Sequence, residues 1–303
     1  MRDALVAQVL KYALINRDIY LITGDLGFGV LDEFSRKLPE QFINAGVAEQ
    51  NMTGVAAGLA LDKRLVFTYS IANFPTMRCL EQIRNDVLYH GLSVNVIGVG
   101  GGFSYGQLGM SHHATEDIGV LRPLPRLRIY APCDISETIA AVDHVVNEIG
   151  PSYIRIDKSM VSGVSVECSD VRSLRKLRDG KDVLIVGYGG ILQEAIIAAE
   201  SLMNSGISCA IYSAMSIKPF SEEEFVALAR QYDCVVTLEE HSIIGGLASV
   251  VAETYCKFGY FPKYRISFAI ADEFCSIVGS QAFLRDSSGI SSNHIISKIS
   301  SLG

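Results

Sequence analysis

The chain has 303 residues, of which 49% are hydrophobic, and a formal net charge of −7 at pH 7. This length allows two domains of ordinary size with a large buried core. An acidic chain is poorly suited to binding the phosphate backbone of nucleic acids, and the sequence has no uninterrupted apolar run of about 18 residues. We therefore expect a folded protein with no nucleic acid and no membrane as its partner.

Short β-branched segments alternate with helical patterns through the first half of the chain. The opening segment is amphipathic and leads directly into this alternation, so we expect no signal peptide. The strands that we expect lie at 19–24, 41–46, 65–71, 94–100, 127–132 and 152–157, and the helices at 3–15, 51–61, 75–90 and 134–148. Strands that are apolar on both faces and separated by helices predict an α/β layer with a mainly parallel sheet.

Residues 158–180 interrupt this alternation with a polar segment that has no clear period. A second alternation follows, with strands expected at 182–189, 208–215, 234–240 and 264–270, and helices at 191–204, 221–232 and 246–258. We therefore predict an α/β fold of two doubly wound domains, 1–165 and 181–303, joined by a linker at 166–180. The basic run at 171–180 favours a solvated linker over a phosphate or partner patch.

The seven cysteines are widely spaced, odd in number and contain no CxxC pair. This pattern supports neither a disulfide framework nor a zinc site. We expect reduced, mostly buried thiols in a cytoplasmic protein. The cysteines are Cys79, Cys133, Cys168, Cys209, Cys234, Cys256 and Cys275.

Glu49 stands at the entrance of the small, apolar segment INAGVAEQNMTGVAAGLA (43–60). A buried, unpaired carboxylate is costly, so Glu49 needs water or a dedicated partner. The residues alone leave two roles open, a cap of the helix that follows or a contact to a ligand.

Several loops carry further candidate residues. Asp25 in GDLGFG (24–29) is either a helix N-cap or a site residue, and His112 ends the glycine-rich loop 98–113 in either a site or a structural role. The string GYGGI (187–191) lacks the full spacing of a dinucleotide turn, so tight strand-to-helix packing is favoured.

The segment TLEEHSIIGGLA (237–248) places two carboxylates and a histidine at the end of an expected strand. That position in an open α/β sheet is prone to bind ligands. Helix capping combined with an interdomain contact is the favoured interpretation of Glu239, Glu240 and His241.

In their order along the chain, these motifs carry a specific resemblance. GDLG, NAGVAEQNMTGVAAGLA, NFPTMRCLEQIRND, GQLGMSHHATEDIGVLRPLP and APCDISE together resemble the pyrimidine-binding domain of the transketolase family. KPFSEEEF and EEHSIIGGLASVVAE are similar to the C-terminal domain of the same family. The resemblance extends over essentially the whole chain and implies thiamine diphosphate as the cofactor.

The family's diphosphate and Mg²⁺ site has no counterpart in this sequence. The GDG motif, followed in that family some 25–30 residues later by Asn, is absent, and no cluster of oxygen ligands suited to Mg²⁺ is apparent. The resemblance therefore implies the C-terminal subunit of a split enzyme. Its partner would be an N-terminal subunit that carries the diphosphate-binding domain and holds Mg²⁺, in an α₂β₂ assembly. The apolar face of residues 52–60 would pack either against the partner subunit or in the core of this chain.

The resemblance assigns four residues to the cofactor. Glu49 matches the glutamate that contacts the pyrimidine N1′ and promotes the imino tautomer of the cofactor. Phe74 matches the aromatic residue that stacks on the pyrimidine. Ile71 falls where relatives often carry another aromatic residue, so it lines the apolar pocket. Asp25 matches the aspartate near the thiazolium ring.

Substrate contacts follow from the same resemblance. His112 matches the histidine near the cofactor amino group and the substrate oxygens, and it is a candidate for proton transfer. Arg2 and Arg155 align with phosphate-binding arginines, although Arg155 is equally placed to pair with Asp157 on one face of its strand.

Two positions depart from the family. Leu108 replaces an aspartate that holds a donor hydroxyl, and Gly100 replaces a phosphate-binding histidine. These departures put ordinary pentose-phosphate exchange in doubt, and a modified or nucleotide-linked sugar is consistent with them.

The function that we expect is the transfer of a two-carbon ketol or similar acyl unit between sugar-type substrates. One alternative is the β subunit of a 2-oxo-acid dehydrogenase or decarboxylating synthase. Another is an α/β binding protein without catalytic activity.

Overall fold

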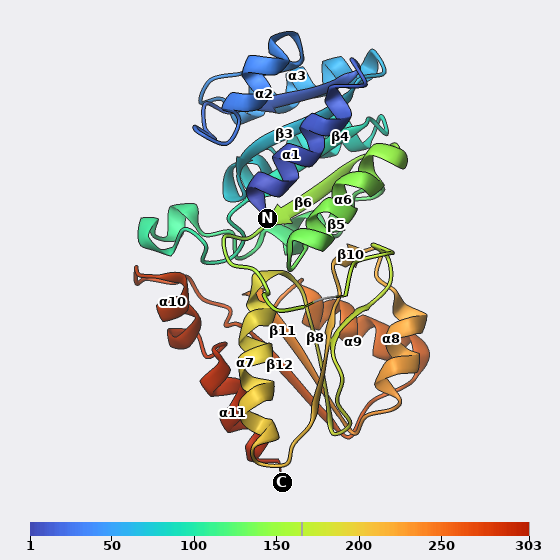
Figure 1. Ribbon diagram of the computed structural model, residues 1–303, viewed down its shortest axis with the longest axis vertical. Helices are drawn as coiled ribbons and strands as arrows, with labels where there is room; N and C mark the ends of the chain where they lie inside the picture. The colour runs from blue at the N-terminus through green and yellow to red at the C-terminus, as the bar shows by residue number, and fades with distance from the viewer. Residues whose placement is uncertain (165, 303) are drawn as a thin grey trace.

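The computed structural model describes residues 1–164 and 166–302, and its two sheets lie in two halves of an elongated molecule (Figure 1). The N-terminal half of the chain forms the upper half in that view, and the C-terminus lies at the opposite end. The predicted boundary residue Ser165 lies outside the described residues. The predicted fold class, two α/β domains, is confirmed.

The first sheet has seven strands in the order β10-β5-β6-β4-β3-β1-β2. All neighbouring pairs are parallel except β10 with β5. The strands are β1 Ile19–Thr23, β2 Phe42–Asn44, β3 Leu65–Ile71, β4 Val94–Val99, β5 Arg128–Tyr130, β6 Ser152–Ile156 and β10 Ser216–Lys218. The mainly parallel sheet was predicted, but β10, which crosses over from the second half of the chain, was not.

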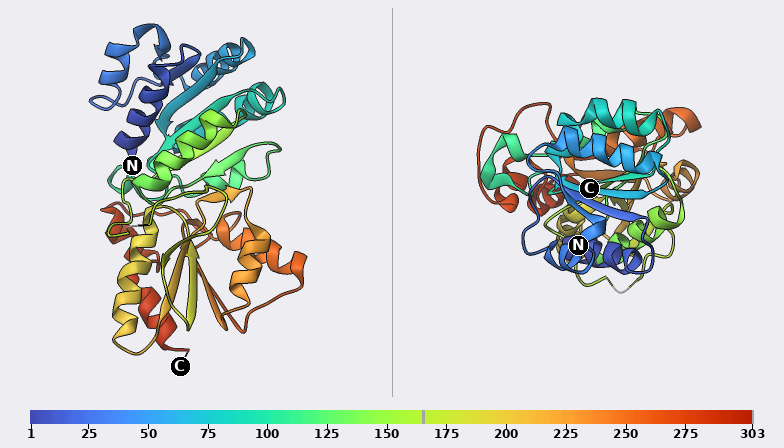
Figure 2. Two further views of the ribbon diagram at one scale, coloured as in Figure 1. Left: turned by 45° about the vertical axis from the view of Figure 1, so that its right-hand side comes forward. Right: turned by 90° about the horizontal axis from the view of Figure 1, so that it is seen from above.

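Helices cover both faces of this sheet (Figure 2). The helices α1, α2 and α6 pack on one face around Leu5, Phe34 and Val142, while α3, η3 and α5 pack on the other around Met52, Ile83 and Leu121. Their bounds, with short helical turns labelled η, are α1 Arg2–Ala13, α2 Asp32–Lys37, η1 Pro39–Gln41, α3 Glu49–Leu61, η4 Gly106–Leu108, η5 Met110–His112, α5 Asp117–Leu121 and α6 Ile135–Asn147.

The helix predicted at 75–90 is not one regular α-helix. A π-helical turn, η2, spans Phe74–Arg78, a single α-turn, α4, spans Leu80–Gln82, and a second π-helical segment, η3, spans Ile83–Leu88. Such π-turns are rare in proteins, and those that occur often lie at functional sites.

The second sheet has five strands in the order β12-β11-β8-β9-β7, of which only β7 is antiparallel to its neighbour. The strands are β7 Arg175–Arg178, β8 Val183–Gly187, β9 Cys209–Ser213, β11 Cys234–Ser242 and β12 Tyr264–Ile270. The helices are η6 Gly189–Ile191, α7 Leu192–Met203, α8 Glu222–Ala229, α9 Leu247–Phe258, α10 Gln281–Ser287 and α11 Ser292–Ser300.

Strand β7 corrects the predicted linker. Residues 171–180 are not simply solvated, because β7 pairs with β9 and Arg175 is buried. Its Nη1 lies 2.8 Å from Asp134 Oδ2 and 3.2 Å from Glu137 Oε1 in the first domain. A buried guanidinium needs such carboxylate partners, so this arginine fastens the second sheet to the first domain.

The favoured interpretation of the 237–248 segment is confirmed by its hydrogen bonds. Glu239 accepts from the backbone N–H groups of Leu247 and Ala248 at 2.7 and 2.8 Å and so caps α9. His241 Nε2 accepts from the N–H of Gly119 at 3.0 Å, across the domain boundary. Burial raises the pKa of Glu239.

Arg155 lies at the centre of the same boundary. Its side chain is 1% exposed, and its Nε donates to Asp117 Oδ2 at 3.0 Å. Its Nη2 donates to the carbonyls of Ala114 and Glu240 at 3.1 and 2.9 Å, and its Nη1 lies 3.5 Å from Asp157 Oδ1. Burial opposes the charged form, but the two carboxylates outweigh it and raise the pKa of Arg155.

This geometry corrects the predicted substrate contact of Arg155. The guanidinium is enclosed by protein groups, so no surface of it is left for a substrate. The alternative from the sequence, an ion pair with Asp157, is present. Burial raises the pKa of Asp157, while Arg155 opposes that rise.

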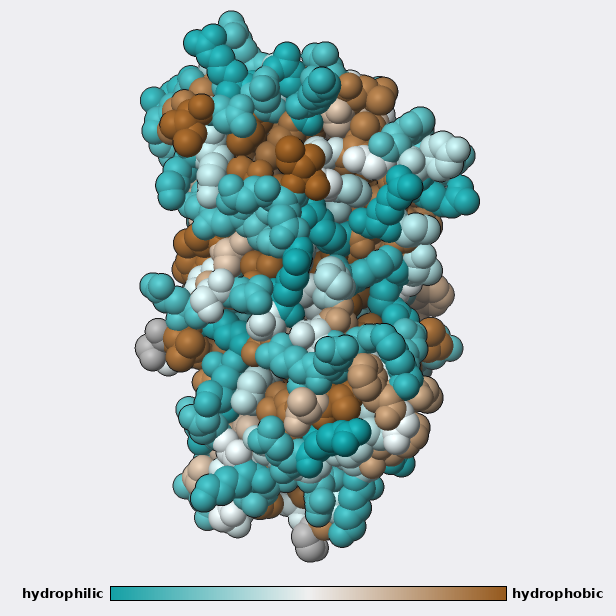
Figure 3. Space-filling view, turned by 90° about the vertical axis from the view of Figure 1, so that its right-hand side faces the viewer, coloured by the Kyte–Doolittle hydropathy of each residue, from teal (hydrophilic) through white to brown (hydrophobic). Residues whose placement is uncertain are grey.

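The surface in Figure 3 alternates hydrophilic areas with separate hydrophobic patches, the larger of which lie over the first domain. In residues 1–164 and 166–302 no helix combines the length and the apolar character that crossing a bilayer requires.

We expect Asp117→Ala to destabilise the protein by about 3–5 kcal/mol, because it leaves the buried Arg155 charge without its closest carboxylate. Urea denaturation would measure the change. Glu33→Ala, which removes an exposed ion pair with Lys37, is the control and should leave the midpoint unchanged. A loss below about 1 kcal/mol for Asp117→Ala would show that Arg155 does not depend on this partner.

Candidate functional site

Glu49 is the first residue of α3, directly after the turn at 46–48 that leaves β2. Its side chain is 2% exposed, and its Oε2 accepts a hydrogen bond from Arg78 Nη1 at 2.5 Å. The end of β1 packs against this side chain: a Cβ at Gly24 would lie 3.5 Å from Glu49 Cγ, an ordinary van der Waals distance. The carboxylate is therefore buried beneath the carboxyl edge of the first sheet.

Phe74 and Ile71 form the apolar wall beside this carboxylate. Strand β3 ends at Ile71 and η2 begins at Phe74, and both side chains are only partly buried. The guanidinium carbon of Arg78 lies 4.6 Å from the centre of the Phe74 ring. The guanidinium of Arg78 thus connects the ring of Phe74 to the Glu49 carboxylate.

His112 reaches this wall from the loop after β4. Gly102 and Ala114 exchange backbone hydrogen bonds of 2.9 and 3.0 Å and close the base of the loop. At its tip, Asn73 Nδ2 donates to the carbonyl of Ser111 at 2.6 Å. The ring of His112 meets Phe74 edge-on at 5.2 Å between centroids.

Asp25 lies next to Gly24 in an exposed, left-handed conformation with φ of 59°. Its Oδ1 accepts from Asn44 Nδ2 at 2.8 Å, which joins the ends of β1 and β2. Asp25 does not cap a helix, because α2 starts at Asp32. Through Gly24, it lies close to the Glu49 side chain.

A cavity of about 330 Å³ lies beside Tyr105, which follows β4 on the same loop as His112. Arg2 and Lys158 line it together with Tyr105, whose ring lies 6.5 Å from that of His112. Lys158 Nζ stands 3.6 Å from the centre of the Tyr105 ring, and burial, with Arg2 nearby, lowers the pKa of Lys158. The carboxylates of Asp3 and Asp157 belong to the same lining, and Arg2 pairs with Asp3 at 3.1 Å.

The ring of Tyr105 explains why position 100 is a glycine. Gly100 has φ of +87°, and a Cβ there would lie 2.1 Å from the ring of Tyr105. Tyr105 therefore fills the space that a side chain at position 100 would need. Leu108, the second departure, is exposed on the same loop.

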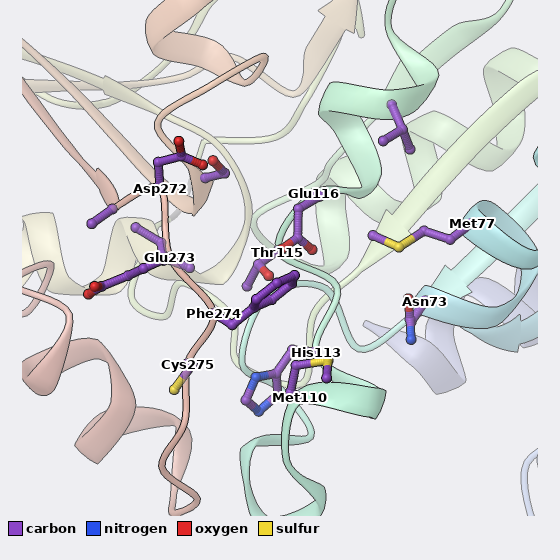
Figure 4. A pocket seen from close by; sticks show the side chains of 14 residues that line it. Asn73, Met77, Met110, His113, Thr115, Glu116, Asp272, Glu273, Phe274 and Cys275 are labelled. Carbon is purple, nitrogen blue, oxygen red and sulfur yellow. The ribbon is translucent and has the colours of Figure 1, made fainter.

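A larger cavity of about 550 Å³ lies between the two domains (Figure 4). Asn73, directly before η2, and Met77, within η2, line it from the first domain. Asp272, Glu273, Phe274 and Cys275 line it from the second. Because Asn73 and Met77 flank Phe74, this cavity adjoins the wall beside Glu49.

Residues 1–163 match the pyrimidine-binding domain of transketolase, and residues 172–295 match the C-terminal domain of transketolase. The chain belongs to the transketolase family. The first match alone spans more than half of the chain, and the two follow each other in the order that the motifs indicated.

Transketolase subunits are among the similar proteins. A subunit of the apulose-4-phosphate transketolase of Phocaeicola vulgatus is 36% identical over 84% of this chain and 82% of its own length. The 6-deoxy-6-sulfo-D-fructose transketolase subunit SqwH of a Clostridium species is 34% identical over 98% of this chain and 92% of its own. A split-gene transketolase solved as an inactive β₄ tetramer has a TM-score of 0.85 at 31% identity, covering 99% of this chain and 96% of that one.

Side-chain contacts link three of the predicted residues, Glu49, Phe74 and His112, and bring in three residues that were not predicted. Arg78 joins Glu49 to the Phe74 ring, and His112 meets that ring edge-on. Ile71 ends the strand before Phe74, and Asp25 follows Gly24, but neither they nor Glu49, Phe74 and His112 line the two cavities described above. Arg2 stands further out, beside the smaller cavity, and Arg155 is buried in the domain junction. The sequence analysis missed Arg78, Tyr105 and Lys158. Of these only Lys158 could have been found from the sequence, because it follows Arg155 by three residues, just beyond the end of the same strand.

We expect Asn73→Ala to loosen the His112 loop, because it removes the hydrogen bond to Ser111. Amide hydrogen exchange should speed up at residues 109–112, with a stability loss of about 1 kcal/mol. Asn147→Ala removes a similar side-chain bond on α6 and should leave exchange at 109–112 unchanged. Equal exchange in both variants would mean that Asn73 does not hold this loop.

Proposed function

We propose that this chain is the C-terminal subunit of a two-subunit, thiamine-diphosphate-dependent transketolase-like enzyme. It would transfer a two-carbon ketol unit between sugar-type substrates. The observation that carries the proposal is the buried Glu49 carboxylate at the start of α3, beside the partly exposed ring of Phe74. The family membership and the subunit names of two relatives support it.

The residues present fit the pyrimidine half of this cofactor. Glu49 and Phe74 already contact the guanidinium of Arg78. Like an aminopyrimidine, a guanidinium is planar and carries N–H groups. Thiamine diphosphate would supply the carbanion chemistry of ketol transfer. Glu49 would hold the proton at the pyrimidine N1′, Phe74 would stack on the ring, Ile71 would line the pocket, and Asp25 would face the thiazolium side.

The diphosphate and Mg²⁺ would be bound by another chain. No group of three or more His, Cys, Asp and Glu residues in the described part of the chain is arranged to hold a metal ion. We propose an N-terminal subunit as the partner, in an α₂β₂ assembly. A cytoplasmic location of the enzyme agrees with the unpaired state of the cysteines among the described residues, four of which are buried.

Helix α3 offers one face for such an assembly. Met52, Ala56 and Ala60 point into the core, which accounts for the packing alternative. Gly54 and Leu61 are exposed on the other side of the helix. We propose this outer face as part of the subunit contact, and the β₄ tetramer of the similar split-gene transketolase is consistent with association through the small subunit.

His112 would act on substrate oxygens. Its imidazole adjoins both Phe74 and Tyr105, so it lies between the proposed pyrimidine subsite and the smaller cavity. A histidine in that place can transfer a proton to or from a hydroxyl or carbonyl oxygen, a role worth typically about 10²–10⁴-fold in rate.

The smaller cavity supports a sugar with an anionic end group. Lys158 makes no ion pair within the described residues and shares the cavity with Arg2. Two relatives are named for a sugar phosphate and a sulfo sugar, both anionic. With Tyr105 in the space next to Gly100, a modified sugar is favoured over ordinary pentose phosphates, and a nucleotide-linked sugar belongs to the substrate class to be screened.

The test of this function is a donor and acceptor screen on the reconstituted two-subunit complex with thiamine diphosphate and Mg²⁺. Ketol transfer from a ketose to an aldose is the expected result. Decarboxylation of a 2-oxo acid without ketol transfer would instead indicate a dehydrogenase or synthase subunit. No cofactor binding at all would indicate a binding protein without this chemistry.

We expect Glu49→Ala to lower kcat of the complex by about 10²–10⁴-fold, because the proton at N1′ loses its carboxylate. Glu49→Gln, which keeps the shape of the side chain, should lose a similar factor. Steady-state kinetics with saturating cofactor would measure both. Full turnover of Glu49→Ala would refute the assigned role even if the family activity is present.

We expect Lys158→Met to raise KM for a phosphorylated aldose about 10-fold at nearly constant kcat, because it removes a cation that meets the anionic end. KM for uncharged glycolaldehyde should not change. Lys176→Met, which removes an exposed lysine paired with Asp179, is the control. Equal effects of Lys158→Met on both acceptors would argue against an anion subsite.

A further inference from the structure

Glu49 has a partner within its own chain that the sequence did not reveal. Arg78 Nη1 lies 2.5 Å from Glu49 Oε2, and this is the only side-chain hydrogen bond of the Glu49 carboxylate within the described residues. The two residues differ sharply in exposure: the glutamate side chain is 2% exposed and the arginine side chain 47%. A half-exposed cation therefore neutralises a fully buried anion.

The same guanidinium also covers the aromatic wall. Its central carbon lies 4.6 Å from the centre of the Phe74 ring, within the range of a cation–π contact. Arg78 thus meets both of the groups that the proposed function gives to the cofactor's aminopyrimidine. A guanidinium is planar and presents N–H donors in its plane, so it satisfies a carboxylate and an aromatic face together.

The backbone at Arg78 is held while its side chain is free to turn outward. Gln50 Nε2 donates to the carbonyl of Arg78 at 3.0 Å, and the residue ends the η2 turn. The guanidinium makes no other hydrogen bond or ion pair within the part of the chain that the structure describes. Among the described residues, moving the guanidinium away would therefore break only its hydrogen bond to Glu49 and its contact with Phe74.

We propose that Arg78 is a displaceable positioning residue of the cofactor site, whose guanidinium occupies the pyrimidine subsite until the cofactor moves it out. The inference rests on the proposed function and deepens it. In the cofactor-free chain Arg78 satisfies the Glu49 carboxylate, and without Arg78 that carboxylate would be buried with no partner. The cofactor then competes with Arg78, so its affinity is reduced by the strength of the internal pair.

The test is a calorimetric titration of the two-subunit complex with thiamine diphosphate at saturating Mg²⁺. Arg78→Met removes the charge and keeps most of the length of the side chain. We expect it to bind the cofactor about 5- to 30-fold more tightly, the factor that corresponds to one hydrogen bond of about 1–2 kcal/mol. The cofactor-free variant should melt at a lower temperature, and its gain in Tm on adding cofactor should be larger.

Two further variants sharpen the result. Arg78→Gln keeps a planar polar group without the charge and is judged by the same criterion, so the outcome does not depend on one substitution. Arg84→Met removes an exposed arginine from η3 and should leave both affinity and Tm gain at wild-type values.

The outcomes separate the two proposals. Unchanged or weaker cofactor binding by Arg78→Met and Arg78→Gln, with normal binding by the wild-type complex, would overturn the role of Arg78 alone. Failure of the wild-type complex to bind thiamine diphosphate would overturn the proposed function, and this inference with it.

Discussion

The buried charge of Arg155 is the constraint on which the arrangement of the two domains depends. Its guanidinium donates to Asp117 and the Ala114 carbonyl in the first domain and to the Glu240 carbonyl near the end of β11. A charge removed from water requires such complete coordination, and here no single domain supplies it. The same side chain therefore holds the two domains in one relative position. A hydrophobic cluster that includes Ile129 of the first domain and Leu184 of the second also joins them.

The position of His112 follows from this junction. The loop that carries it is closed at Gly102 and Ala114, and the Ala114 carbonyl itself accepts from Arg155. The glycines at the start of the loop are required because a Cβ at Gly101 would lie 2.5 Å from the Arg155 guanidinium, and one at Gly102 would lie 2.6 Å from Glu240. The rigid junction thus sets the base of the loop, and its contact with η2 sets the tip.

Local patterns in the sequence were enough to predict the two sheets and to nominate candidate site residues. Continuous apolar strands and intervening helices indicated the sheets, and motif order located Glu49, Phe74 and His112. The short edge strands β7 and β10 were missed because each is defined by its neighbour in the sheet rather than by its own composition. Arg155 was assigned to the substrate because its position on a strand does not reveal that other parts of the chain, such as the carbonyls of Ala114 and Glu240, bury it. Arg78 was missed because its ion pair joins residues 29 positions apart.

The buried carboxylates of the protein differ in how they are satisfied, and this difference sets Glu49 apart without any reference to the family. Glu137 and Glu239 accept backbone N–H groups of their own fold, and Glu240 accepts the N–H of Phe103 as well as Arg285. Those donors are fixed when the chain folds. Glu49 is as deeply buried but depends on one half-exposed side chain. A carboxylate whose partner can leave without unfolding the chain is available for another partner, and the others are not.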